Sequence, residues 1–138
     1  MGHAKLDLAV LELGSVVSGA ASSILASKQG VPDAIDYVYA SRTSTSLQAA
    51  KEQLQLLRHS TQFSVLDIEQ EPSEQGFGDK TFDLVVGCNA FDDVQSIEKA
   101  LANAKKLLRP GGKLCLVELV NPGIQAMAVL GCVCSWWR

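Results

Sequence analysis

The chain has 138 residues, of which 47% are hydrophobic and 20% charged, with a formal net charge of −3. This size and composition fit one compact globular domain, and we expect a single domain over residues 1–138. Basic residues cluster only at Lys105–Lys106 and Arg109. The charge distribution therefore argues against nucleic acid as a partner, because phosphate binding requires clustered Lys and Arg.

The N-terminal segment Met1–Asp7 lacks a cationic stretch followed by an apolar core. No apolar run reaches the roughly 18–20 residues that span a bilayer. These two features predict a cytoplasmic protein with no membrane partner.

Four cysteines are present, namely Cys88, Cys115, Cys132 and Cys134. The first two lie in apolar runs, where a free cysteine behaves as a small hydrophobe. The other two form a lone C-x-C, and a zinc site would need a second pair of ligands. The sequence predicts buried, reduced thiols and no metal site.

In the first half of the chain, two apolar runs are each followed by a helix-like segment. A strand over Leu6–Leu13 ends at Gly14 and leads to a helix over about Gly19–Lys28. A second strand covers Asp36–Ala40, and the Ser/Thr stretch Ser41–Ser46 offers caps for the next helix. That helix runs to about Arg58 and has one apolar face, composed of Leu47, Ala50, Leu54 and Leu57.

The second half continues the alternation. A third strand is expected over Phe63–Ile68, and a polar loop leads to a fourth over Phe82–Cys88, whose apolar composition is typical of a central strand. A helix over about Val94–Leu108 should bury Ile97, Leu101, Ala104 and Leu108. The segment Arg109–Gly112 should end this helix, before a fifth strand over Lys113–Val120. The pattern predicts a doubly wound, mostly parallel α/β sheet that binds ligands at the carboxyl ends of its strands.

Several motifs follow one another at a spacing that resembles a known family. They are Leu11-Glu12-Leu13-Gly14, the loop to Ala20, Leu66-Asp67-Ile68-Glu69, Gln75-Gly76-Phe77, Phe82-Asp83-Leu84-Val85, Asn89, Lys106–Leu114 and the pair Trp136–Trp137. Together they resemble the C-methyltransferase domain of fungal highly reducing polyketide synthases, within the class I S-adenosylmethionine-dependent methyltransferase superfamily. The resemblance implies a Rossmann-like sheet of about five strands, truncated and lacking the last two strands of the family.

The resemblance also implies a vestigial cofactor site. Glu12, Gly14 and Gly19 match the loop that holds the methyl donor, and Asp67 matches the acid near its adenine. Two glycines of that loop are replaced by Val16 and Ser18, whose side chains occupy ligand space. The acid that would bind the ribose is replaced by Ser41. We therefore expect no cofactor, although a vestigial S-adenosylmethionine site remains possible.

Other roles stay open for these residues. A tight strand-to-helix turn needs small residues whatever it binds, and Asp67 could cap the turn after its strand. Asp92 occupies the position of the family's histidine base, yet Asp92 and Asp93 also suit the N-terminus of the following helix. Asn89 could bind a carbonyl or thioester, or close a turn.

Three functions are compatible with this pattern. The first is a repurposed cyclase, pericyclase or isomerase that acts on a polyketide intermediate. Its candidate polar groups lie near the strand ends and are Tyr37, Tyr39, Asn89, Asp92 and Glu118. The second is a non-catalytic module that docks to a polyketide synthase, and the third is a genuine C-methyltransferase. The uncovered fifth strand and the apolar segment Ile124–Trp137 predict a homodimer.

Overall fold

The computed structural model describes residues 8–14, 35–54, 61–78, 81–91 and 93–117. These residues form a five-stranded sheet in which every neighbouring pair of strands is parallel. The strands are β1 (Leu8–Gly14), β2 (Ile35–Ser41), β3 (Thr61–Val65), β4 (Phe82–Cys88) and β5 (Leu108–Val117), and the helices are α2 (Ser44–Leu54), the short 3-10 helix η1 (Pro72–Gln75) and α3 (Ile97–Leu107). The expected α/β fold class is confirmed.

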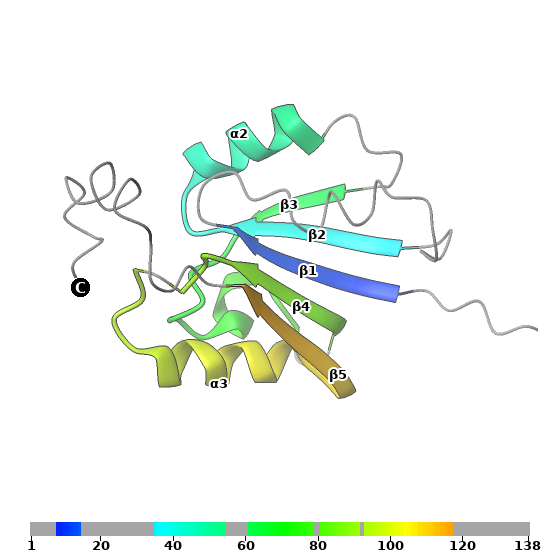
Figure 1. Ribbon diagram of the computed structural model, residues 1–138, viewed down its shortest axis with the longest axis vertical. Helices are drawn as coiled ribbons and strands as arrows, with labels where there is room; N and C mark the ends of the chain where they lie inside the picture. The colour runs from blue at the N-terminus through cyan, green and yellow to red at the C-terminus, as the bar shows by residue number, and fades with distance from the viewer. Residues whose placement is uncertain (1–7, 15–34, 55–60, 79–80, 92, 118–138) are drawn as a thin grey trace, which may run out of the picture.

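The strand order is β3-β2-β1-β4-β5, so β1 is the central strand. Side chains of β1 alternate between two apolar clusters. Leu11 and Leu13 pack with the buried side of α3, whereas Val10 packs with Leu47 and Ala50 of α2. The two helices therefore cover opposite faces of the sheet (Figure 1). The buried positions of Leu47 and Ala50 confirm the expected inner face of α2.

The inner face of α3 differs from the expected one. The helix buries Ala100, Ala104, Leu107 and the polar Asn103, whereas Ile97 is 55% exposed. Asn103 can lie inside because its amide donates to the carbonyl oxygens of Ile68 at 2.8 Å and Gln70 at 2.9 Å. Because Asn103 is polar, the spacing of apolar residues does not reveal the buried face of α3. The apolar pattern therefore wrongly predicts Ile97 and Leu101 on the buried face.

The fifth strand begins earlier than expected. β5 starts at Leu108 and contains the whole Arg109–Gly112 segment. Its register against β4 shifts between the pairs Phe82–Leu108 and Leu84–Lys113, and Gly111 has a φ of 79°. The Pro-Gly-Gly sequence therefore forms a bulge within the strand rather than a turn before it, because a glycine at positive φ absorbs the extra residues.

β5 is also more exposed than expected. Cys88 and Cys115 are free thiols, but Cys115 is exposed. Leu116 is 37% and Val117 53% exposed. No strand lies beyond β5 in the part of the chain that the structure describes, which explains why its apolar pattern does not correspond to a buried strand. Within the same ranges, no helix is both long and apolar enough to cross a membrane.

Candidate functional site

The carboxyl ends of the three central strands lie side by side. Gly14 at the end of β1 is in register with Ser41 of β2 and with Cys88 of β4. The chain order reverses here, because β2 lies on one side of β1 and β4 on the other. In an open α/β sheet this reversal leaves a crevice that binds ligands.

A pocket of about 220 Å³ occupies this crevice. Its apolar wall is formed by Leu13, Ala40, Leu66, Ile68 and Ala90, and its remaining lining by Gly14, Ser41, Arg42, Thr43, Ser46 and Asp93. The apolar wall belongs to the face of the sheet that α3 covers. The pocket therefore combines an apolar surface with a few polar groups, as small-molecule sites do.

Ser41 is the most deeply buried polar residue of the pocket lining, with an exposure of 3%. Its carbonyl oxygen accepts a hydrogen bond from the Leu66 N–H at 2.9 Å, which joins the end of β2 to the residue after β3. Within the described ranges its hydroxyl has no hydrogen-bond partner. An unmade buried hydrogen bond costs about 1–3 kcal/mol, so this hydroxyl is available to a ligand.

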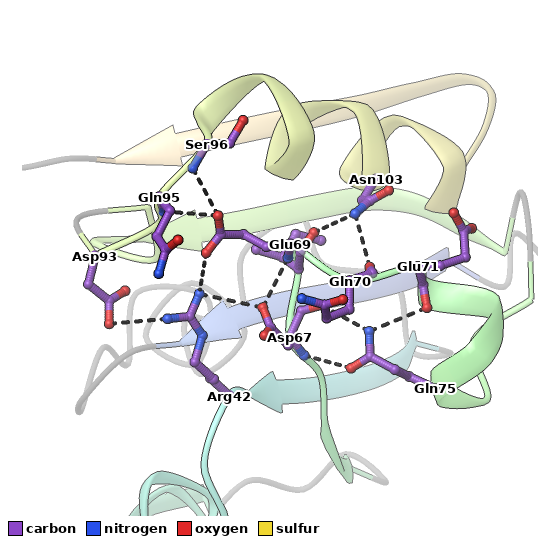
Figure 2. Close-up of polar contacts among 11 residues, drawn as sticks. Arg42, Asp67, Glu69, Gln70, Glu71, Gln75, Asp93, Gln95, Ser96 and Asn103 are labelled. Carbon is purple, nitrogen blue, oxygen red and sulfur yellow. Dashed lines mark hydrogen bonds and ion pairs between the residues drawn. The ribbon is translucent and has the colours of Figure 1, made fainter.

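Arg42 lies at the centre of a cluster of acidic side chains (Figure 2). Its guanidinium is 2.9 Å from Glu69, 3.4 Å from Asp67 and 3.6 Å from Asp93. These partners come from the segments that follow β3 and β4. Arg42 follows β2, and it therefore links the exits of three strands around the pocket.

Glu69 holds this cluster against the start of α3. One oxygen of its carboxylate accepts the backbone N–H groups of Gln95 at 2.9 Å and Ser96 at 2.8 Å, and the other contacts Arg42. The two N–H bonds, from Ser96 and then Gln95, lower the pKa of Glu69 below its ordinary value of 4.5, and Arg42 adds to the effect. The partial positive charge at the N-terminus of a helix also stabilises the ionised form of a nearby carboxylate.

Asp67 caps the turn that follows β3. Its Oδ1 accepts the Glu69 N–H at 3.0 Å and also faces Arg42. The amide of Gln75 reaches back to the Asp67 backbone, accepting its N–H at 2.8 Å and donating to its carbonyl at 2.9 Å. The turn-capping role of Asp67 is thus observed, and its side chain is not part of the pocket lining. A role of Asp67 near an adenine stays a prediction.

Glu12, Tyr37 and Tyr39 lie on the opposite face of the sheet, toward α2. All three are buried, and the Tyr37 hydroxyl donates a hydrogen bond to the Glu12 carboxylate. Burial, and then the nearby Glu12, raise the pKa of Tyr39 to about 12. None of these side chains lines the pocket. The catalytic role of Tyr39 and the cofactor role of Glu12 stay predictions.

Gly14 lines the pocket, but its lack of a side chain has a second cause. A β-carbon at residue 14 would collide with the phenol ring of Tyr39. The glycine is therefore required for the packing of the sheet as well as for space at the crevice.

Asn89 follows β4 in a left-handed conformation with a φ of 48°. Its N–H donates to the Val117 carbonyl at 2.8 Å, so it closes the end of β4 against β5. Asparagine tolerates this conformation better than most residues. Asn89 places its neighbour Ala90 in the pocket lining.

Several predicted positions lie outside the described residues. They are Gly19, Asp92 and Glu118 of the candidate site, together with Val16, Ser18, Cys132, Cys134 and the pair Trp136–Trp137. Arg42 and Glu69 are not among the site residues predicted from the sequence. A signal existed, because both are charged residues placed just after strands that run to the same edge of the sheet.

Comparison with known proteins identifies the family. The sequence matches the model described as a methyltransferase domain over residues 11–116. The chain belongs to this family.

Its relatives include large fungal synthases. The chain is 38% identical, over 100% of its length, to the partially reducing polyketide synthase men1 of Menisporopsis theobromae. It is also 38% identical, again over 100% of its length, to the partially reducing polyketide synthase tpeA of Talaromyces stipitatus. The chain spans only 6% of each of these relatives.

Solved structures of similar proteins agree with the fold. The CurJ carbon methyltransferase superposes with a TM-score of 0.83 and 28% identity, covering 96% of this chain and 35% of that one. CalH, a trans-methyltransferase in complex with SAH, superposes with a TM-score of 0.82 and 26% identity, covering 96% of this chain and 38% of that one. The resemblance to polyketide synthase C-methyltransferase domains is confirmed.

Proposed function

We propose that the chain acts on a polyketide intermediate as a cyclase, pericyclase or isomerase, in association with a polyketide synthase and without transferring a methyl group. The observation that carries this proposal is Ser41, which lines the pocket where the resemblance places an acid for the ribose of the methyl donor. A carboxylate accepts hydrogen bonds from two neighbouring ribose hydroxyls on two separate, negatively charged oxygens, whereas a serine has a single uncharged oxygen.

The rest of the pocket supports the same proposal. An acyl chain needs an apolar wall and one or two polar groups to orient its carbonyl, and the pocket offers both. Holding a flexible chain in a reactive conformation can itself supply much of the acceleration of an intramolecular reaction. Ser41 would orient the chain, Asn89 would hydrogen-bond its carbonyl or thioester group, and Asp92 remains the candidate group for proton transfer.

The fold is compatible with more than one chemistry. The protein titled [4+2]-cyclase SpnF superposes with a TM-score of 0.64 at 20% identity, covering 86% of this chain and 42% of that one. This likeness concerns the fold alone, and function depends on the residues of the site rather than on the fold.

A genuine C-methyltransferase is the second candidate. The likeness to a carbon methyltransferase at 28% identity, and to a trans-methyltransferase complexed with SAH at 26%, favours it. The cofactor would then need contacts other than the ribose acid.

Calorimetric titration with S-adenosylmethionine and S-adenosylhomocysteine separates the two candidates. We expect weak or undetectable binding, because the lost ribose contacts cost about 1–3 kcal/mol for each unmade bond. A dissociation constant in the low micromolar range would reject the first proposal. The triple variant Val16→Gly, Ser18→Gly and Ser41→Asp should strengthen binding.

The reaction itself is tested with a linear polyketide thioester and the purified protein. The expected product has the same mass as the substrate, and Asn89→Ala or Asp92→Ala slows its formation. A product heavier by one methylene, formed only with the methyl donor, would establish the second candidate instead.

We further propose that the protein is cytoplasmic and forms a homodimer or docks to a synthase through β5. The exposed Leu116 and Val117 at the edge of the described sheet support an interface there. Light scattering at micromolar concentration tests self-association, and a mass near 14.7 kDa would contradict it.

A further inference from the structure

The burial of the lining residues shows where the pocket opens. Ser41 and Leu66 line it and are buried, so they belong to its floor. Arg42, Thr43 and Asp93 line it and are exposed, so they belong to its mouth. Arg42 and Thr43 follow β2, whereas Asp93 lies between β4 and α3. The mouth therefore has two rims that come from different parts of the chain.

An ion pair spans this mouth. The guanidinium of Arg42 lies 3.6 Å from the carboxylate of Asp93 (Figure 2). The strands that carry the two rims, β2 and β4, are separated by β1. Neighbouring strands are about 4.8 Å apart, so the pair bridges roughly 10 Å of the sheet edge. Gly14, which ends β1 between the rims, has no side chain to fill that space.

The three carboxylates around Arg42 hold it unequally. Glu69 lies at 2.9 Å and its side chain is 12% exposed, and Asp67 lies at 3.4 Å and is 34% exposed. Asp93 is the most distant at 3.6 Å, which is too long for a hydrogen bond, and it is 54% exposed. Asp93 is therefore the partner that detaches first, while Glu69 keeps the guanidinium in place.

Detachment of Asp93 leaves no buried charge without a partner. Arg42 retains Glu69 and Asp67, and the Asp93 carboxylate is exposed enough to be hydrated by water. Exposed ion pairs contribute little to stability. Rotation of the Asp93 side chain alone can thus open the mouth without disturbing the sheet or the helices.

We infer that Arg42 and Asp93 form a latch over the pocket. The closed ion pair slows the entry and exit of small molecules, and release of Asp93 opens the way. Arg42 is the fixed half of the latch, because Glu69 anchors it, and Asp93 is the moving half. The latch controls access to the pocket whichever of the two candidate reactions takes place there.

A thiol placed inside the pocket measures access without any ligand. Ser41→Cys is nearly isosteric and puts the thiol on the buried floor. Iodoacetamide is neutral and small enough for a cavity of about 220 Å³, and peptide mass spectrometry follows alkylation at position 41. Adding Asp93→Asn, which removes the charge but keeps the size of the side chain, should accelerate this alkylation about two- to fivefold.

Two native thiols serve as internal references. Cys115 is exposed on β5 and Cys88 is half-buried at the end of β4, and neither lines the pocket. Their alkylation rates should be the same with and without Asp93→Asn. An equal acceleration at Cys88 would reveal a general loosening of the strand ends and would overturn the latch.

Lys106→Ala is the matched control variant. It removes the ion pair between Lys106 and Glu71, which is also partly exposed and lies outside the pocket lining. Alkylation of the pocket thiol should not change in this background. An acceleration as large as that caused by Asp93→Asn would attribute the effect to lost stability and contradict the latch.

Ala90→Cys provides a second reporter on the β4 side of the pocket, independent of any effect that Ser41→Cys has on β2. Ala90 lines the pocket and is half-buried, so the same acceleration is expected. Equal rates with and without Asp93→Asn at both reporters, or no alkylation of either one, would overturn the inference.

Salt gives a further measurement on the protein that retains Asp93. The Debye length falls from about 10 Å at 0.1 M to about 3 Å at 1 M salt, which weakens a partly exposed ion pair. Relative to Cys115, alkylation of the pocket thiol should accelerate with salt when Asp93 is present and stay constant in Asp93→Asn. Parallel salt series in the two proteins would contradict the latch.

Discussion

The phenol ring of Tyr39 fills the space in which residue 14 would carry a β-carbon. Gly14→Ala therefore forces a shift of either β1 or Tyr39, and both lie in the middle of the sheet. We expect a loss of about 1–3 kcal/mol in the free energy of unfolding, as is typical of overpacked cores. Urea denaturation measures it.

Gly78→Ala is the control for that substitution. A β-carbon at residue 78 would lie 3.4 Å from Thr81 Oγ1, which is an ordinary contact. The free energy of unfolding of the Gly78→Ala protein should differ from that of the wild type by less than about 0.5 kcal/mol. If Gly14→Ala were equally mild, the close packing of Tyr39 on β1 would be wrong.

Asn103→Ala should destabilise the protein by about 2–3 kcal/mol. The substitution leaves the carbonyl oxygens of Ile68 and Gln70 without the buried amide that they now share. Thermal and urea unfolding report the loss, with the exposed Lys105→Ala on the same helix as the control. Equal stability of the two variants would rule out a structural role for the Asn103 amide.

Acidification should destabilise the protein partly through Glu69. Its pKa is lowered in the folded state, so the folded protein binds this proton less readily than the unfolded chain does. The contribution is present above pH 4.5 and is lost as the pH falls through the lowered pKa. Glu69→Gln should flatten the pH dependence of unfolding in this range, and the exposed Glu52→Gln should leave it unchanged.

Alkaline conditions should destabilise the protein through Tyr39. Its pKa is raised from 10.0 to about 12, because burial disfavours the phenolate. The folded state therefore retains a proton that the unfolded chain releases between pH 10 and 12, and stability falls across that window. In Tyr39→Phe the fall should be smaller, as measured by urea unfolding from pH 9 to 12. An identical slope in both proteins would disprove this assignment.

The strand pattern was largely predictable from the sequence. Phe82–Cys88 is predicted and observed with the same bounds, since an apolar run buried on both faces has few alternatives. β3 was harder. It ends at Val65, yet Leu66 and Ile68 are buried beyond it, so the apolar run extends past the hydrogen-bonded strand.

The site was less predictable than the fold. The resemblance to the family's motifs pointed to Gly14 and Ser41, and both line the pocket. Arg42 was missed because its importance depends on three carboxylates from two other segments. Tyr39 has the same strand-end signal as Ser41, but the alternation of side chains along β2 places it on the opposite face of the sheet.

The side chain of Gln75 imitates a peptide group. It meets both the N–H and the C=O of Asp67, as a neighbouring strand would do. Replacing its NH₂ by an oxygen, as in deamidation or Gln75→Glu, turns the donor into an acceptor that faces the carbonyl of Asp67. The turn that carries Asp67 and Glu69 would then lose its support, and Arg42 would lose two of its partners. Deamidation of Gln75, a residue that does not line the pocket, would thereby alter the position of Arg42, which does line it.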